Sequence, residues 1–141
     1  MTRPHALIVD DEPDIRELIE ITLARMDVET TTAESLARAF DVVEGSPGFD
    51  LCLTDMRLPD GSGIDLVRHM QRHHPNVPVA MITAHGNMDS AVQALKAGAF
   101  DFVSKPLDLK VLRGLVQTAL RLGEQQPASC LLYTSPSPRD S

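Results

Sequence analysis

Short strand-like runs alternate with helical stretches along most of this chain. Four runs are apolar and one is rich in β-branched residues; they cover residues 6–9, 28–32, 51–54, 77–82 and 99–103. Between them, apolar residues recur at three- and four-residue steps, which is the spacing of one helix face. Apolar runs bounded by turn residues are typical of parallel strands buried on both faces. We therefore predict a single α/β domain with a five-stranded parallel sheet, doubly wound by five helices.

The sequence changes in character near its C-terminal end. Residues 124–127 favour a linker, and the remainder is rich in Ser and Pro without periodicity. Residues 130–140 also look like translated sequencing-adapter DNA, so we leave them out of the functional argument as non-native. We predict one domain over residues 1–123, followed by a disordered linker and tail over residues 124–141.

Charge and hydropathy exclude several classes of protein. A formal net charge of −7 over 141 residues disfavours a surface for nucleic acid or an anionic membrane on this chain. No run approaches about 18 consecutive apolar residues, and the N-terminus lacks the apolar core of a signal peptide. Cys52 in a core strand and Cys130 in the tail do not make a disulfide framework. We expect a cytoplasmic protein that binds neither nucleic acid nor membrane.

Polar side chains stand at the ends of four predicted strands. They are Asp10, Asp11, Asp55, Thr83 and Lys105. Because parallel strands end at one edge of the sheet, where open α/β folds bind ligands, we expect these residues to lie together. Carboxylates that are so close repel one another and need a cation, and their oxygens suit Mg²⁺. In such a site Asp55 can attack phosphorus, while Lys105 and the Thr83 hydroxyl stabilise the phosphoryl oxygens.

In these residues the chain resembles the receiver domain of bacterial two-component response regulators. The resemblance covers roughly residues 6–122 and implies a flavodoxin-like (βα)5 fold with strand order 2-1-3-4-5. It implies that Asp55 accepts a phosphoryl group from a sensor histidine kinase. It also implies that Asp11 and Asp55 ligate Mg²⁺, whereas Asp10 acts on the metal indirectly.

Further positions match the same family. The resemblance implies that the backbone carbonyl of Arg57 ligates Mg²⁺ and that a cis peptide bond precedes Pro106. The residues that it assigns to phosphoryl binding and switching are Thr83, Ala84, Phe102 and Lys105. For Phe102 an ordinary core role stays open, because aromatic residues on strands are usually buried. The family's output surface corresponds to about residues 88–122, through which we expect a homodimer.

Three segments resemble the nitrogen-regulator class of these proteins more narrowly. They are residues 7–18, 55–63 and 96–102. Members of that class couple the receiver to an ATPase that activates sigma-54 RNA polymerase and to a DNA-binding helix-turn-helix. The resemblance therefore implies control of sigma-54-dependent transcription through domains outside this chain.

Two other functions are compatible with parts of the pattern. A free-standing receiver could act as a protein-interaction adaptor. A Mg²⁺-dependent phosphohydrolase of the haloacid-dehalogenase type also uses a nucleophilic aspartate on a parallel sheet. That type needs a second acid two residues after the nucleophile, where this chain has Arg57. We therefore do not expect an enzyme, beyond promotion of its own aspartyl phosphorylation and dephosphorylation.

Histidines gather near the end of the third predicted helix. His69, His73 and His74 are interpreted as a solvated face rather than a metal site. His85, two residues after Thr83, is assigned to a solvent-facing loop.

Overall fold

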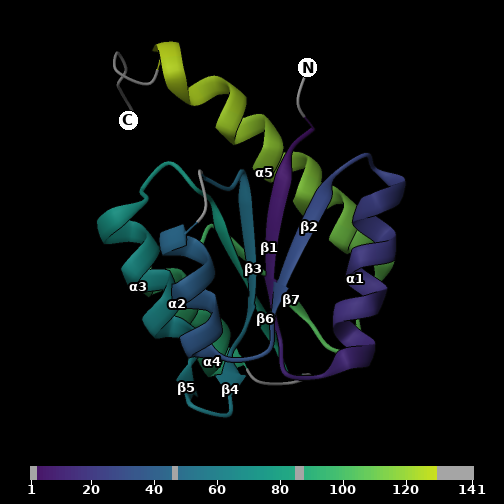
Figure 1. Ribbon diagram of the computed structural model, residues 1–141, viewed down its shortest axis with the longest axis vertical. Helices are drawn as coiled ribbons and strands as arrows, with labels where there is room; N and C mark the ends of the chain where they lie inside the picture. The colour runs from purple at the N-terminus through teal and green to yellow at the C-terminus, as the bar shows by residue number, and fades with distance from the viewer. Residues whose placement is uncertain (1–2, 46–47, 85–87, 130–141) are drawn as a thin grey trace.

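The computed structural model shows a five-stranded parallel sheet with helices packed on both faces (Figure 1). The described residues are 3–45, 48–84 and 88–129. For residues 123–129 only the backbone is described. The predictions for His85 and for residues 130–141, with Cys130, lie outside the described residues.

The strands and helices follow the predicted alternation. The sheet consists of β1 (His5–Val9), β2 (Glu29–Ala33), β3 (Leu51–Asp55), β6 (Val79–Thr83) and β7 (Asp101–Ser104). The helices are α1 (Pro13–Arg25), α2 (Leu36–Gly45), α3 (Gly63–His73), α4 (Met88–Ala97) and α5 (Leu109–Ser129). The strand order is β2-β1-β3-β6-β7, with every neighbouring pair parallel. This is the order 2-1-3-4-5 that the resemblance implied, so the predicted fold is confirmed.

Local sequence signals explain where the helices begin and end. Pro13 opens α1, where its missing N–H costs nothing. The Ser62 hydroxyl accepts a hydrogen bond from the backbone of Ile64 at 3.1 Å and caps α3. Asp108 caps α5 in the same way, with its Oδ1 2.9 Å from the second backbone nitrogen of that helix. Gly98 follows α4 with φ of +126°, a conformation that favours glycine.

Two apolar layers hold the helices to the sheet. Alternate residues of β1 point to opposite faces. Leu7 and Val9 join the layer under α2, α3 and α4, whereas Ala6 and Ile8 join the layer under α1 and α5. Figure 1 shows the same division, with α1 and α5 on one side of the sheet. Because every central strand is buried on both faces, its carboxyl end is held rigidly at one edge of the sheet.

Two features differ from the predictions. The turn after β3 contains a small antiparallel hairpin, made of β4 (Arg57–Leu58) and β5 (Gly61–Ser62). In addition, α5 continues to Ser129, whereas a linker was expected over residues 124–127. Glu, Gln and Ala favour helices, and extending an existing helix is easier than nucleating one. The boundary of the domain at residue 123 stays a prediction.

Asp60, at the tip of this hairpin, caps a helix elsewhere in the chain. Its carboxylate accepts hydrogen bonds from the backbone of Leu36 at 2.8 Å and of Ala37 at 2.9 Å. These two bonds lower the pKa of Asp60. The hairpin is thereby attached to the N-terminal end of α2.

The Asp60→Ala substitution is therefore expected to lower the melting temperature at neutral pH. A lowered pKa in the folded state means that the stabilisation is present above the ordinary carboxyl pKa and is lost as the pH falls through the folded value. The difference in melting temperature between the wild type and Asp60→Ala should close in acid. Thermal melts at neutral pH and near pH 3 measure it, and an equal difference at both pH values would contradict the capping role.

Among the described residues, no helix is both long enough and apolar enough to cross a membrane.

Candidate functional site

The carboxyl ends of four strands bring the predicted residues to one edge of the sheet. Asp55 is the last residue of β3, and Thr83 is the last residue of β6. Asp10 directly follows β1, and Lys105 directly follows β7. Because β1, β3, β6 and β7 are consecutive neighbours in a parallel sheet, these four positions lie beside one another.

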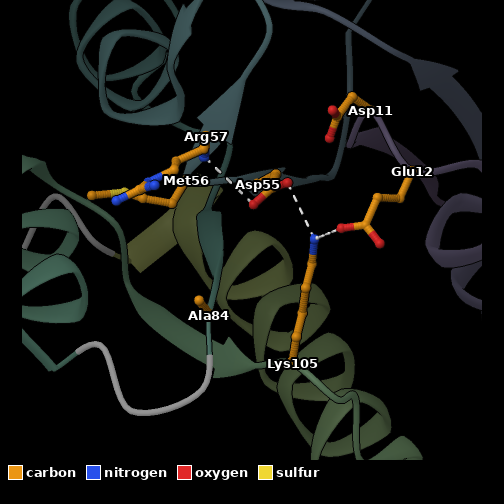
Figure 2. Close-up of a pocket in the computed structure, with 7 residues that line it drawn as sticks. All are labelled: Asp11, Glu12, Asp55, Met56, Arg57, Ala84 and Lys105. Atoms are coloured by element: carbon orange, nitrogen blue, oxygen red, sulfur yellow. Dashed lines mark hydrogen bonds and ion pairs between the residues drawn. The ribbon is translucent and has the colours of Figure 1, made fainter.

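Lys105 contacts three carboxylates at this edge, and Figure 2 draws the contacts with two of them, Glu12 and Asp55. Its Nζ lies 2.7 Å from Glu12 Oε2, 3.2 Å from Asp55 Oδ2 and 3.2 Å from Asp10 Oδ2. Figure 2 shows the lysine reaching from the end of β7 to Asp55, with Glu12 beside its tip. Glu12 was not among the predicted site residues. The sequence feature that could have indicated it is that Glu12 is the third consecutive acid after β1.

Burial controls the electrostatics of two of these acids. Asp10 is 0% exposed and Asp55 is 7% exposed. Burial raises the pKa of Asp55, and the charge of Lys105 opposes this only in part. Burial likewise raises the pKa of Asp10, against a hydrogen bond from the backbone of Glu12. Both carboxylates would therefore be stabilised by a further cation.

Lys105 itself stays positively charged. Burial lowers the pKa of Lys105, but the adjacent carboxylates of Glu12, Asp10 and Asp55 outweigh that effect, and the pKa is raised overall. The lysine is thus a fixed cation next to the Asp55 carboxylate.

Asp10 holds the loop after β1 in place. Its Oδ1 accepts a hydrogen bond from the backbone of Glu12 at 2.9 Å, and its carbonyl accepts one from Arg16 Nη1 at 2.7 Å. Its Oδ2 makes no hydrogen bond to the described residues, although Lys105 Nζ is 3.2 Å away. A buried carboxylate oxygen with only an ion pair is a group that a bound cation or its water ligand can satisfy.

A cavity of about 280 Å³ opens beside Asp55. It is lined by Asp11, Glu12, Asp55, Met56, Arg57, Ala84 and Lys105. Figure 2 shows Asp11 and Glu12 on the loop after β1, on the same side as the Asp55 carboxylate. One oxygen from each of Asp10, Asp11, Glu12 and Asp55 lies within 4.8 Å of the others. Oxygen ligands with room for water are what Mg²⁺ requires, so these residues fit that ion.

The backbone at Asp55 is closely packed. The N–H of Gly63 donates to the carbonyl of Met56 at 2.9 Å, and Thr54 Oγ1 donates to the carbonyl of Asp55 at 3.1 Å. A Cβ atom on Gly63 would lie 2.0 Å from that same Asp55 carbonyl. The N–H of Arg57 is 3.5 Å from Asp55 Oδ1. The start of α3 therefore positions the end of β3. No sequence pattern indicates this contact, so this role of Gly63 was not predicted.

Of the residues assigned to switching, Ala84 lies at the cavity, whereas Thr83 and Phe102 do not line it. Ala84 lines the cavity. Thr83 is buried, and its hydroxyl donates to the carbonyl of Val103 at 3.4 Å rather than lining the cavity. Phe102 is half-buried and packs against the apolar layer under α2, α3 and α4. The Lys105–Pro106 peptide bond is cis, as the resemblance implied. The acids, the lysine and Ala84 are thus together, while Thr83 and Phe102 are not among the residues that line the cavity.

The fold is that of a known class of signalling domain. The family model of the response regulator receiver domain matches residues 6–117. The chain therefore belongs to the response regulator receiver family. A receiver domain protein from Clostridium thermocellum has a similar structure, with a TM-score of 0.79 and 30% identity over 86% of this chain and 97% of that one. The receiver domain of NtrX from Brucella abortus has a TM-score of 0.77 at 35% identity, over 82% and 98% of the two chains.

Two transcriptional or response regulators have sequences similar to this chain. The response regulator protein PilR of Pseudomonas aeruginosa is 65% identical over 122 residues, which is 86% of this chain. The DNA-binding transcriptional regulator NtrC of Escherichia coli is 35% identical over 126 residues, or 89% of this chain. The chain spans 27% of the length of each of these two relatives. The predicted resemblance to the nitrogen-regulator class is confirmed.

Proposed function

We propose that Asp55 is a phosphoacceptor, through which this receiver domain takes a signal from a sensor histidine kinase. The observation that carries the proposal is that Asp55 is buried, with its carboxylate 3.2 Å from Lys105 Nζ and beside an acidic cavity. In the proposed step a carboxylate oxygen of Asp55 attacks the phosphorus of a phosphohistidine. The O–P bond forms and the N–P bond breaks. The imidazole leaves with the electron pair and takes up a proton from water.

Mg²⁺ is the cofactor that we propose for this step. Asp11, Asp55 and the backbone carbonyl of Arg57 would hold the ion. Asp10 would act indirectly, since it contacts Lys105 and fixes the loop that carries Asp11. When bound, Mg²⁺ neutralises charge on the phosphoryl oxygens. Lys105 would do the same, and it keeps its own charge because its pKa is raised.

Thr83, Ala84 and Phe102 are the residues that we propose to transmit the change. The Thr83 hydroxyl would leave the Val103 carbonyl and donate to a phosphoryl oxygen, with Ala84 moving beside it. This motion would shift the surface formed by α4, β7 and α5, on which Phe102 lies. Exposed apolar side chains on α4 and α5 support a role of this surface in homodimerisation; they are Met88, Val92, Leu95 and Val111.

The Thr83→Val substitution tests this transmission. It removes the hydroxyl and keeps the shape of the buried side chain, so we expect Asp55 to be phosphorylated as fully as in the wild type. The amide shifts of α4 that accompany phosphorylation in the wild type should be largely lost, because no hydroxyl remains to follow the phosphoryl group. NMR spectra with and without phosphorylation measure this. The Thr30→Val variant, on edge strand β2, should behave as the wild type.

The output that we propose is control of sigma-54-dependent transcription through domains outside this chain. PilR and NtrC, which have similar receivers, support this proposal. The domain over residues 1–123 would itself bind neither nucleic acid nor membrane. It would act on no separate small substrate and would promote only its own phosphorylation and dephosphorylation.

Intact-protein mass after incubation with acetyl phosphate tests the proposed function. We expect one added phosphoryl group in the presence of Mg²⁺ and none after chelation. The Asp55→Asn variant should gain no mass, because its amide is not nucleophilic. The Asp41→Asn variant removes an exposed acid from α2 and should react as the wild type does. A folded wild-type chain that gains no phosphoryl group with Mg²⁺ would refute the proposal.

A further inference from the structure

A second group of metal-binding side chains lies at the C-terminal ends of α2 and α3. Glu44 is the next-to-last residue of α2, His69 lies in the second half of α3, and His74 directly follows α3. One ligand atom of each lies within 4.8 Å of those of the other two. None of the three lines the acidic cavity beside Asp55.

The two imidazoles differ in their hydrogen bonding. His69 Nε2 lies 3.0 Å from Glu44 Oε2, so this pair is already joined. The Nε2 atom of His74 is buried and has no hydrogen-bond partner among the described residues. A buried ring nitrogen without a partner is uncommon and calls for a ligand. The Phe40 ring packs 5.0 Å from the His69 ring, between centroids, and limits where that imidazole can lie.

We propose that Glu44, His69 and His74 form a binding site for a divalent transition-metal ion such as Zn²⁺. Two imidazole nitrogens and one carboxylate oxygen are ligands that Zn²⁺ takes readily, with water in the remaining position. Mg²⁺ instead requires oxygen ligands and would not bind here. The site is therefore chemically distinct from the acidic cavity beside Asp55, whose metal-binding groups are carboxylates.

The geometry needs only a small adjustment to bind the ion. Two ligands that each lie about 2.1 Å from one Zn²⁺ are at most about 4.2 Å apart. The ligand atoms here are within 4.8 Å of one another before any ion is bound. The Glu44 side chain is 63% exposed and that of His69 is 24% exposed, so the carboxylate can turn inward and the ion can enter from solvent.

Binding would link the ends of α2 and α3. The ligands come from two helices that adjoin only in the folded chain, so the ion would stabilise the folded state. The histidines had been interpreted as a solvated face, rather than a metal site, on one predicted helix and its end. Glu44 comes from another helix, and the structure brings it to His69.

Calorimetric titration of the untagged full chain with ZnCl₂ tests this site. The Asp55→Asn background removes one of the four carboxylates of the acidic cavity, and excess Mg²⁺ competes with Zn²⁺ for those that remain. We expect one Zn²⁺ per chain, and an affinity at least about tenfold lower in Glu44→Gln and in His74→Gln. The His73→Gln variant is the matched control. Its ring lies 4.6 Å from that of His69 but it is not one of the three ligands, so its affinity should be unchanged.

Co²⁺ provides a second measurement that does not depend on a buried substitution. In the chain with only Asp55→Asn, which is the parent for these variants, we expect the visible absorption of a low-coordinate Co²⁺ site. This absorption should be lost in Glu44→Gln. Because the Glu44 side chain is exposed, the substitution should leave the fold intact, so misfolding would not explain the loss. No Zn²⁺ binding by the folded parent chain would overturn the proposal. Equal affinities in the parent and Glu44→Gln, or an equal loss in His73→Gln, would also overturn it. Each of these results leaves the phosphoacceptor proposal for Asp55 intact.

Discussion

The Gly63→Ala substitution is expected to destabilise the folded domain by about 3 kcal/mol, a large effect for one methyl group. The added Cβ would lie 2.0 Å from the backbone carbonyl oxygen of Asp55 and 3.0 Å from Thr54 Oγ1. A backbone atom of a central strand cannot move aside as a flexible side chain can, so α3 must shift away from β3. Urea unfolding followed by circular dichroism measures the loss of stability.

The same variant should also phosphorylate more slowly than the wild type. The carbonyl that would be displaced belongs to Asp55 itself, and positioning of a nucleophile depends on small distances. The rate of phosphorylation by acetyl phosphate should therefore fall even at temperatures where the variant remains folded.

Gly114→Ala is the matched control for Gly63→Ala. Gly114 is exposed within α5, and apart from its chain neighbours and the nearby backbone of the same helix a Cβ atom there would have no atom within 4 Å. Alanine is the better helix former, so this variant should be more stable than the wild type by about 0.5–1 kcal/mol. A Gly63→Ala variant that loses less stability than about 1 kcal/mol would show that the end of β3 is not held by α3 as described.

The second large effect is expected at Lys105. Replacing it with glutamine should slow phosphorylation of Asp55 by at least about 100-fold, because the site loses a cation aimed at the transferring phosphoryl group. The glutamine amide keeps much of the length and polarity of the side chain but carries no charge. Time courses of phosphoryl incorporation at saturating Mg²⁺ measure the rate.

Stability should change together with the rate. Without Lys105, the buried carboxylates of Asp10 and Asp55 keep no cation within contact distance among the described residues. We expect Lys105→Gln to melt at a lower temperature than the wild type in EDTA, and Mg²⁺ to recover much of the difference. Lys110→Gln, which removes an exposed lysine from α5, should change neither property. A Lys105→Gln variant that reacts at the wild-type rate would remove the lysine from the mechanism.

Much of the fold could be predicted because its signals are local. Each central strand is a short apolar run, and helix starts such as Pro13 and Ser62 carry the residue types that their backbone geometry requires. The topology then places the strand ends together without further information. The residues at those ends, Asp10, Asp55 and Lys105, meet as expected because parallel strands terminate at one edge.

What could not be predicted depends on contacts between distant segments. Glu12 directly precedes α1, and only the approach of Lys105 from the end of the last strand reveals its ion pair. Only glycine fits at position 63, because α3 starts against the backbone carbonyl of Asp55. The spacing of apolar residues in the sequence gives no sign of this contact. The orientation of Thr83 toward β7 likewise follows from packing rather than from the sequence pattern.

The measurement that tests the phosphoacceptor assignment most directly is the location of the phosphoryl group. The chain is treated with acetyl phosphate and Mg²⁺ and then reduced with borohydride, which converts an aspartyl phosphate to homoserine. Peptide mass spectrometry identifies the position. We predict that Asp55 alone is converted, and only when Mg²⁺ was present. Conversion of Asp10 or Asp11 instead, or of no aspartate in a folded chain that has gained a phosphoryl group, would contradict the assignment.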